Sequence, residues 1–317
     1  MKDQLVKALV CEGRVRVYID RTTDMVAEAQ SRFHLQPLTT IALGRVLSVA
    51  SIMGAMLKSD EEMLTINING GGPAGSIIVD AYANGNVRGF VSNPQADLEL
   101  PVNKPAKVGS LVGREGYLRV IKDLNMEENF EGTVELVSGE IGDDFAYYFT
   151  MSEQTPTAVA TGVGLSSDNH VESAGALVLQ MLPDATDTDI RICEHVLEGL
   201  KPMSTIIKEY DDTNLEQLVK DMFEDAEILE TRDIQFKCTC SRERMASALL
   251  TLPYEEVAAM ADEDHGAEIT CNFCNEVYNF SEDELRELMK KMKEPGAEKP
   301  EEVEEFSISE PETDEGR

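Results

Sequence analysis

The sequence predicts an α+β fold with three ordered parts: an N-terminal mixed α/β-sheet domain, a helical connector and a small C-terminal module. Three observations support this division. Over residues 1–183, short strand-like and helix-like segments are mixed without a strict βαβ alternation. Residues 184–236 are strongly acidic and carry apolar residues at helical spacing. Residues 237–293 hold four of the six cysteines of the chain.

The N-terminal domain opens with alternating and helical patterns that can be assigned one by one. Residues 13–20 (GRVRVYID) alternate with period two and predict a strand, and residues 22–33 begin at Thr or Asp and predict a helix. A long helix is expected after Thr39 or Thr40, because apolar residues recur there at helical spacing. Strands are expected at 63–68, 76–82, 117–121, 133–137, 157–163 and 174–181, with a hairpin turn at Asn84-Gly85.

Two N-terminal features bear on the cellular compartment. The stretch TIALGRVLSVASIMGAMLK (40–58) is short for a membrane span and carries Arg45, so it predicts a buried or amphipathic helix. The start MKDQLVKALV has no apolar signal-peptide core. We therefore expect a cytoplasmic protein in a reducing compartment, where clustered cysteines indicate metal or redox chemistry.

The connector, residues 184–236, has 15 acidic and 5 basic residues. Its apolar residues fall into two helical runs, separated by Gly199 and Pro202, and such short helices need a neighbouring surface to be stable. After the C-terminal module, residues 294–317 hold ten acidic and two basic residues, which predicts a disordered tail.

The net charge of −32 limits the partners of the protein. Such a field repels nucleic acid and anionic membrane surfaces, so neither is expected as a partner. High charge favours solubility, although an organism with generally acidic proteins would produce the same value.

Cys238-Thr-Cys240 and Cys271-Asn-Phe-Cys274 form the strongest chemical motif. Four thiolates suit one tetrahedral zinc ion per chain, and the intervening segment can fold back to bring the pairs together. His265 could replace one thiol, and Lys237, Arg242 and Arg244 could offset the thiolate charge or be ordinary helix charges. Ser241, and Ser281 with Glu284, are expected to cap two of the module's helices, with a third at 254–262.

Two interpretations of the four thiols stay open on spacing alone: a static zinc knuckle and a redox switch. Each pair is close enough in sequence to form a local disulfide, which would consume the ligands of the metal. A structural zinc site contributes about 10–16 kcal/mol in apparent terms, whereas a whole domain is stable by about 5–15 kcal/mol. A module of this size that loses its metal should therefore unfold, unless the new disulfides support it.

Other candidate motifs have weaker support. GGGPAG (70–75) has the G-x-G-x-x-G spacing, but a β-branched run follows it instead of a helix, so we reject dinucleotide binding. Ser152-Glu153-Gln154 lacks a nucleophile elbow and predicts a helix end or turn. Cys11 and Cys193 stand isolated and are expected to be buried small apolar residues. We expect no enzyme active site; a thiol oxidoreductase using Cys271 and Cys274 would need a thioredoxin-like context, which is not visible.

The run FKCTCSRERMASALLTL…EITCNFCNEVYNFSEDEL resembles the zinc module of the 33 kDa chaperonin (heat shock protein 33) family. Upstream segments resemble the same family: GRVLSVASIMGAMLK, GGGPAGSIIVDAYANGNVRGFVSNP, YYFTMSEQTPT and GALVLQMLP. The resemblance extends from near the start to about residue 293 and leaves the acidic tail outside it.

This resemblance implies a redox-regulated, ATP-independent holdase that binds unfolding proteins during oxidative stress. It implies an inactive reduced monomer with zinc on Cys238, Cys240, Cys271 and Cys274, and an oxidised dimer with disulfides 238–240 and 271–274. It also assigns roles to the segments: chaperone and dimerisation domain (1–183), metastable linker (184–236) and zinc-binding redox switch (237–293). The alternative from another class is a regulatory protein whose zinc module binds nucleic acid, which would require basic patches.

Overall fold

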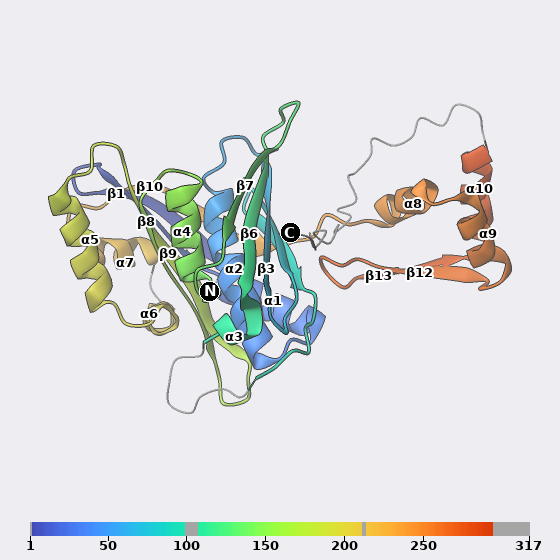
Figure 1. Cartoon of the computed structure of the whole chain (residues 1–317), viewed down its shortest axis with the longest axis horizontal. Helices are drawn as coiled ribbons and strands as arrows, with labels where there is room; N and C mark the ends of the chain where they lie inside the picture. The colour runs from blue at the N-terminus through green and yellow to red at the C-terminus, as the bar shows by residue number, and fades with distance from the viewer. Residues whose placement is uncertain (1, 99–106, 211–213, 294–317) are drawn as a thin grey trace, which may run out of the picture. The chain divides into compact units, whose positions relative to one another are not determined.

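The structure is a computed structural model that describes residues 2–98, 107–210 and 214–293. The chain forms two compact units (Figure 1). The larger unit comprises residues up to Cys238 together with Asn272–Asn275, and the smaller unit comprises Thr239–Cys271 and residues from Glu276 onward. This division falls two residues after the expected start of the C-terminal module at 237. The expected disordered tail, 294–317, lies outside the described residues.

The first sheet of the larger unit has five antiparallel strands in the order β10-β1-β2-β9-β8. Its strands are β1 (Gln4–Val10), β2 (Val15–Arg21), β8 (Thr157–Leu165), β9 (Val171–Met181) and β10 (Glu227–Asp233). The strand predictions for β2, β8 and β9 are confirmed. The sequence did not lead us to expect β1, nor a strand within the connector, and β10 is such a strand at the edge of this sheet.

The second sheet has six strands in the order β11-β5-β4-β3-β6-β7 and is antiparallel except for the short parallel pair β11 and β5. Its strands are β3 (Met63–Gly71), β4 (Ile77–Tyr82), β5 (Asn86–Val91), β6 (Gly113–Asp123), β7 (Phe130–Glu135) and β11 (Gln235–Phe236). The predicted hairpin at Asn84-Gly85 joins β4 to β5, and Gly85 has a φ of +85°. Glycine is favoured there because other residues rarely adopt that conformation.

Seven helices accompany these sheets in the described part of the larger unit. They are α1 (Thr23–Phe33), α2 (Pro37–Gly54), α3 (Gly109–Val112), α4 (Gly142–Met151), α5 (Asp187–Gly199), α6 (Met203–Glu209) and α7 (Leu215–Met222). The predicted helices α1, α2, α5 and α7 are confirmed. The body of helix α4 was not assigned from the sequence, but Ser152 is its C-terminal cap, in agreement with the helix end or turn predicted at that serine.

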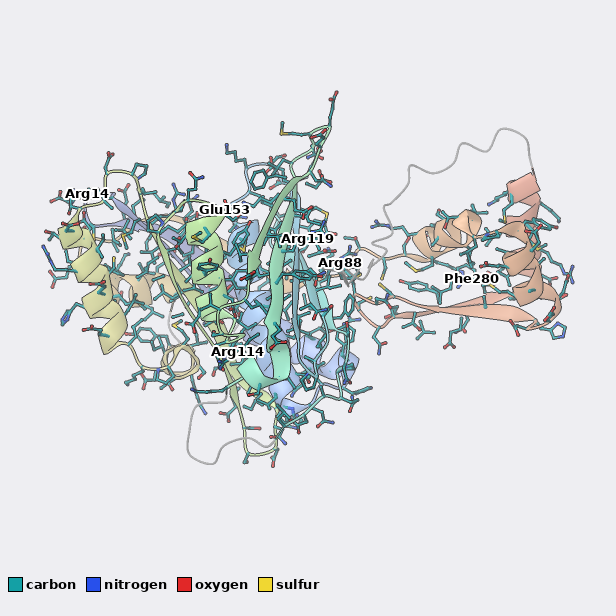
Figure 2. The ribbon with its side chains drawn as sticks, in the orientation of Figure 1. Arg14, Arg88, Arg114, Arg119, Glu153 and Phe280 are labelled. Atoms are coloured by element: carbon teal, nitrogen blue, oxygen red, sulfur yellow. The ribbon has the colours of Figure 1, made fainter. Side chains whose placement is uncertain are left out.

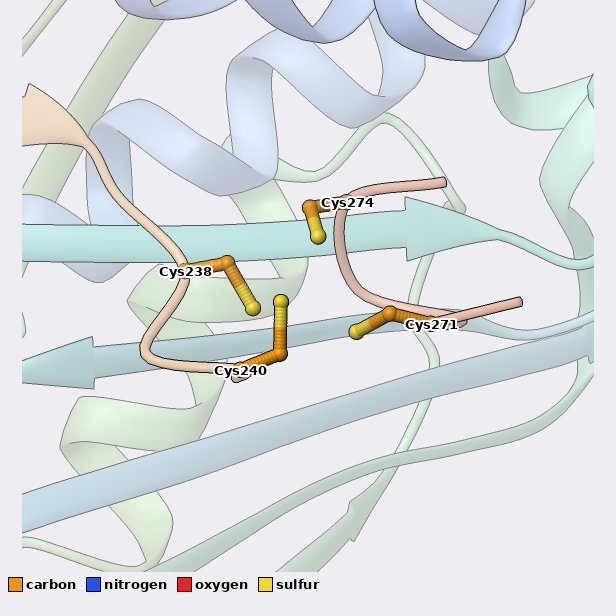
Figure 3. Close-up of side chains that lie close together, drawn as sticks. All are labelled: Cys238, Cys240, Cys271 and Cys274. Carbon is orange, nitrogen blue, oxygen red and sulfur yellow. The ribbon is translucent and has the colours of Figure 1, made fainter. Parts of the chain in front are cut away.

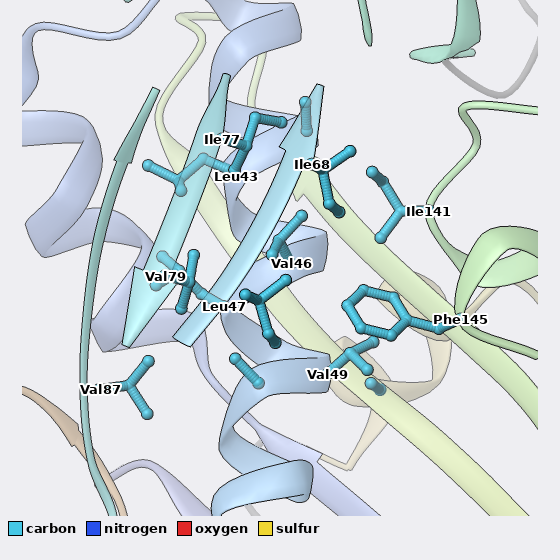
Figure 4. Close-up of a cluster of buried hydrophobic side chains, with 14 of the residues drawn as sticks. Leu43, Val46, Leu47, Val49, Ile68, Ile77, Val79, Val87, Ile141 and Phe145 are labelled. Carbon is cyan, nitrogen blue, oxygen red and sulfur yellow. The ribbon is translucent and has the colours of Figure 1, made fainter. Parts of the chain in front are cut away.

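Helix α2 is the centre of the main core. It packs against strands of both sheets, and nearly all of its residues are buried (Figure 4). By length and composition it could cross a membrane, but 89% of its apolar window is buried inside the protein, as in the core helix of a soluble fold. Arg45 in its body forms an ion pair with Glu140, at 3.3 Å. The figure shows side chains of α2 and α4 meeting the second sheet: Leu43, Val46, Leu47, Val49, Ile68, Ile77, Val79, Val87, Ile141 and Phe145.

Both faces of the central strands β2 and β9 of the first sheet are buried, and side chains along these strands alternate between two cores. In β2, Tyr18 belongs to the main core, while its neighbours Val17 and Ile19 belong to a second apolar cluster. Helices α5, α6 and α7 form the other side of that cluster, and Figure 1 shows them beside β1, β8 and β9. The connector helices therefore depend on one face of the first sheet for their stability.

The glycine run 70–75 serves chain packing. A Cβ on Gly70 would lie 2.5 Å from backbone atoms of Gly113, and one on Gly72 would lie 2.4 Å from the carbonyl oxygen of Leu111. Strand β4 follows this run, so the helix that a dinucleotide-binding fingerprint requires is replaced by a strand.

The smaller unit contains helices α8 (Arg242–Thr251), α9 (Tyr254–Asp262) and α10 (Glu282–Lys293) and the hairpin β12 (Gly266–Thr270) with β13 (Val277–Ser281). The predicted caps are confirmed. Ser241 accepts a hydrogen bond from the Arg244 amide, and the Ser281 amide donates to Glu284 at 2.8 Å. Its buried apolar core, which includes Phe280 (Figure 2), is much smaller than the core around α2: Leu249, Val257, Ala261, Phe280, Leu285, Leu288 and Met289.

Candidate metal centre

The four cysteines that the sequence singles out lie together. Their sulfur atoms are all within 4.8 Å of one another (Figure 3). Cys271 and Cys274 are buried, at 7% and 3% exposure, whereas Cys238 and Cys240 are partly exposed. The cluster is therefore shielded on one side and open to solvent on the other.

Two short backbone segments present these thiols. Cys238 lies two residues after the end of β11, and Cys240 precedes Ser241, the cap of α8. The other pair lies in the turn between β12 and β13, where the Cys271 amide donates a hydrogen bond to the Glu276 carbonyl at 2.9 Å. Asn275 has a φ of +58°, a left-handed conformation that asparagine tolerates well in tight turns.

The donor set fits a metal ion that prefers sulfur ligands. Zinc–thiolate bonds of about 2.3 Å in a tetrahedron place the sulfurs about 3.8 Å apart, so the observed cluster needs only a small contraction. Four thiolates with tetrahedral geometry are typical of structural zinc sites. The four residues can therefore hold a metal ion.

Two side chains donate hydrogen bonds to the sulfurs. The hydroxyl of Tyr278, on β13, donates to Cys240 Sγ at 3.2 Å. Arg88, on β5, donates from Nη1 to Cys238 Sγ at 3.4 Å. Such donors stabilise negative charge on sulfur and orient the ligands of a metal site.

Arg88 is held in place by its other contacts. Its Nε and Nη2 both donate to the same oxygen of Asp80, at 2.9 and 2.7 Å, and both side chains are largely buried. Its guanidinium carbon lies 4.2 Å from the centre of the Phe273 ring, between the two cysteines of the second pair, and Phe90 contacts the same ring edge to face. No sequence motif marks Arg88, because only the folded β4–β5 hairpin brings it to the cysteines.

Arg32 makes a second contact to the Cys271–Cys274 turn. Its Nη1 donates to the Cys274 carbonyl at 3.1 Å, and its own carbonyl accepts from Asn275 Nδ2 at 2.8 Å. Both Arg32 and Asn275 belong to the larger compact unit. These contacts hold the backbone of the turn.

The other charged residues proposed near the thiols have different partners. His265 lies next to Glu282, with Nδ1 3.1 Å from the carboxylate, and is outside the cysteine cluster. Arg242 pairs with Glu284 and stacks on Phe280, and Arg244 donates to Thr239. Arg242 and Arg244 therefore organise the smaller unit itself.

Cys11 and Cys193 are buried, as predicted, at 5% and 2% exposure. Although they stand isolated in the sequence, the two lie near each other in the apolar cluster beneath the connector, where each thiol shifts the pKa of the other. Sequence spacing gave no signal for this contact, because it joins a hairpin turn to a helix far along the chain.

The comparison with known families decides the class of the protein. The family model described as "Hsp33 protein" matches residues 3–281. The chain belongs to the Hsp33 family. It is 45% identical to the 33 kDa chaperonin of Bacillus cytotoxicus over 291 residues, covering 91% of this chain and 99% of that protein. It is also 45% identical to the 33 kDa chaperonin of Bacillus cereus over 293 residues, covering 92% of this chain and 100% of that protein.

A solved Hsp33 structure has the same fold. The crystal structure of the 33 kDa chaperonin from Thermotoga maritima matches with a TM-score of 0.84 and 33% sequence identity, over 92% of this chain and 98% of that one. The α+β fold that the sequence predicts is thus confirmed, and the class of the protein is that of a chaperone.

Proposed function

We propose that this chain is an ATP-independent holdase controlled by a zinc–thiol switch. The observation that carries the proposal is the cluster of four cysteine sulfurs within 4.8 Å in a member of a chaperone family. Cys238, Cys240, Cys271 and Cys274 would hold one zinc ion in the reduced state. When bound, zinc supplies a cross-link between the two ends of the module and keeps the thiolates unreactive.

Oxidation removes this cross-link. Two thiols of a pair and one molecule of hydrogen peroxide give one disulfide and two molecules of water, so two peroxides convert both pairs. The proposed disulfides are Cys238–Cys240 and Cys271–Cys274. Neither disulfide can replace a metal ion that cross-links all four residues, because each disulfide closes only a local loop.

The small core of the Cys-containing unit makes it sensitive to this loss. Seven described apolar residues are buried in that core. Domains this small usually require a metal or disulfide to fold. Loss of the zinc ligands is therefore expected to unfold the module.

We propose that the connector loses its structure after the zinc-binding module unfolds. Its C-terminal end is held by β10 and by the two-residue strand β11, which are both edge strands, and by the Arg88–Cys238 contact. Edge pairing of two residues is weak. Release of Cys238 therefore frees the end of the connector, which makes 184–236 the metastable segment of the chain.

Departure of the connector helices would expose apolar surface for client binding. The face of the first sheet beneath them carries Val6, Val17 and Leu177, and the helices contribute flexible residues such as Met203. The net charge of −32 would keep a client complex soluble. We further propose a monomer–dimer change on oxidation, a cytoplasmic location and no catalytic activity.

The alternative of a nucleic-acid-binding zinc module has less support. Arg242 and Arg244 are engaged in contacts within the smaller unit, and the overall charge repels a polyanion.

The deciding experiment follows a heat-labile client by light scattering. Reduced protein, peroxide-treated protein and peroxide-treated protein reduced again are compared, with released zinc and free thiols measured in the same samples. We expect protection only after oxidation and zinc release. Equal protection by the reduced protein, or oxidant-dependent protection by a variant with all four ligands changed to serine, would contradict the switch.

A further inference from the structure

A second pair of thiols lies far from the cysteine cluster, beneath the connector. Cys11 is in the turn between β1 and β2, with a φ of +53°, and Cys193 is in the second turn of α5. The two thiols lie at the same contact between the hairpin turn and α5, because Arg14, three residues after Cys11, is paired with Asp189, four residues before Cys193. Each thiol shifts the pKa of the other. Both belong to the apolar cluster that joins the first sheet to the connector helices.

A neighbouring ion pair fixes the same two elements together. Arg14, at the end of the hairpin turn, donates from Nε and Nη2 to the two carboxylate oxygens of Asp189, at 2.8 and 3.1 Å. Figure 2 shows Arg14 beside α5. Asp189 precedes Cys193 by four residues, so both lie on one face of α5, turned toward the hairpin. The thiols are thus held close by a contact that is independent of them.

We propose that Cys11 and Cys193 form a reversible disulfide that fastens α5 to the β1–β2 hairpin. This is a redox modification site distinct from the four clustered cysteines. Its regulatory consequence, a brake on release of the connector, rests on the proposed function, whereas the cross-link itself does not.

The chemistry needs a peroxide as the oxidant. The Cys11 thiolate attacks one oxygen of hydrogen peroxide and becomes a sulfenic acid as hydroxide leaves. The Cys193 sulfur then attacks the sulfenic sulfur and displaces its oxygen, which leaves as water. In total, two thiols and one peroxide give one disulfide and two waters.

Cys11 and Cys193 are shielded from oxidants in the folded protein, and this burial determines the conditions under which they react. Burial raises the pKa of Cys11, and burial together with the neighbouring Cys11 raises the pKa of Cys193 to about 12. Since thiolates are the reactive species, oxidation here is slow and requires sustained peroxide or partial loosening of α5. The disulfide then limits how far the connector opens.

The first test maps cross-links in the zinc-loaded full chain. The protein is treated with hydrogen peroxide under mild heating, quenched with an alkylating agent and digested with trypsin without reduction. The expected product joins peptide 8–14 to peptide 192–208, because Pro202 prevents cleavage after Lys201. It should form more slowly than thiol loss at the four clustered cysteines, vanish on reduction and be absent in Cys193→Ser.

The proposal is overturned if Cys11 and Cys193 both remain fully alkylatable in the unfolded sample after the other four thiols are oxidised. This readout uses the wild-type chain and does not depend on the folding of a variant.

The second test measures hydrogen exchange of α5. After identical peroxide treatment, residues 187–199 should exchange at least tenfold more slowly in the wild type than in Cys11→Ala, while the two reduced proteins are compared as a baseline. Equal exchange in the treated proteins would exclude a brake.

The two proposals fail separately. An oxidised chain that protects no client but carries the linked peptides defeats the holdase alone. A chain that protects clients without the linked peptides defeats the Cys11–Cys193 site alone.

Discussion

Arg88 concentrates three interactions in one guanidinium group: an ion pair with Asp80, a hydrogen bond to Cys238 and a cation–π contact with Phe273. One residue of the second sheet thus touches both cysteine-containing segments. The planar shape of the group matters, since a lysine can pair with a carboxylate but cannot donate in several fixed directions and stack at once. Arg88 is therefore a positioning residue for the proposed zinc ligands.

We predict that Arg88→Lys weakens zinc binding by about 10- to 100-fold, the usual effect of changing a partner of a metal ligand. The lysine still neutralises the buried Asp80, so the fold is retained. Zinc transfer to a chromogenic chelator measures the effect. The matched control is Arg119→Lys, another arginine of the second sheet (Figure 2), which pairs with Glu131 on the adjacent strand. Equal transfer rates in both variants would disprove the role of Arg88.

Asp3 gives the larger unit a pH dependence. Its carboxylate accepts hydrogen bonds from the amides of Met25, at 2.7 Å, and Asp24, at 3.1 Å, and is 2% exposed. Burial outweighs these bonds and raises the pKa of Asp3 from 3.8 to about 7. The folded state therefore holds the proton more tightly than the unfolded state between these two values.

The sign follows from this difference: the stability contribution of Asp3 is complete below about pH 4 and is lost as the pH rises through 7. The full change is at most about 4 kcal/mol. We predict that Asp3→Asn flattens the fall in unfolding free energy between pH 5.5 and 7.5, measured by denaturant titration. Asp24→Asn, at an exposed neighbour whose charge contributes less than burial to the raised pKa of Asp3, should flatten it much less. A wild-type curve that is level over this range would refute the assignment.

At the scale of elements, the close approach of α2 to its neighbours depends on Gly44. A Cβ at this position would lie 2.7 Å from Val26 of α1 and 2.8 Å from Val163 of β8. Neither valine can move freely, because both are packed in the main core. The absence of a side chain thus sets the distance between α2 and the first sheet.

We predict that Gly44→Ala destabilises the larger unit by about 1–3 kcal/mol through overpacking. Gly199→Ala is the control, since a Cβ there meets nothing within 4 Å and the change improves helix propensity at the end of α5 by up to about 1 kcal/mol. Denaturant unfolding of both variants distinguishes them. A neutral Gly44→Ala would mean that α2 shifts without penalty.

At the scale of the whole molecule, the two units have very different cores. The larger unit has a main core around α2 and a second cluster beneath the connector, whereas the smaller unit has a single small cluster. The stabilisation from hydrophobic burial increases with the apolar area that each core removes from water. The smaller unit therefore depends most on the proposed zinc site.

We predict that removal of zinc with a chelator under reducing conditions unfolds the smaller unit and leaves the main core intact. Hydrogen exchange at α9 and α10 should rise to that of unfolded chain, with β3 and α2 still protected. The same pattern is expected when all four cysteine ligands are changed to serine. Full protection of α10 without metal would show that the small core is sufficient.

The sequence by itself determined the features that depend on neighbouring residues. Alternation in 13–20 and helical spacing after Thr39 predicted β2 and α2, and Ser241 and Ser281 marked helix starts, because periodicity and capping act within one or two turns. The spacing within each cysteine pair acts locally in the same way, since thiols two or three residues apart converge in a single turn. That the two pairs meet was predicted from the four ligands that a tetrahedral zinc site needs.

Only the tertiary structure decided which distant residues meet. The strands β10 and β11 join the connector to both sheets, Arg88 reaches Cys238 through the β4–β5 hairpin, and α5 brings Cys193 to the hairpin turn that holds Cys11. These contacts depend on how sheets and helices pack over the whole chain. No local pattern encodes them, because each partner alone is an ordinary strand, arginine or cysteine.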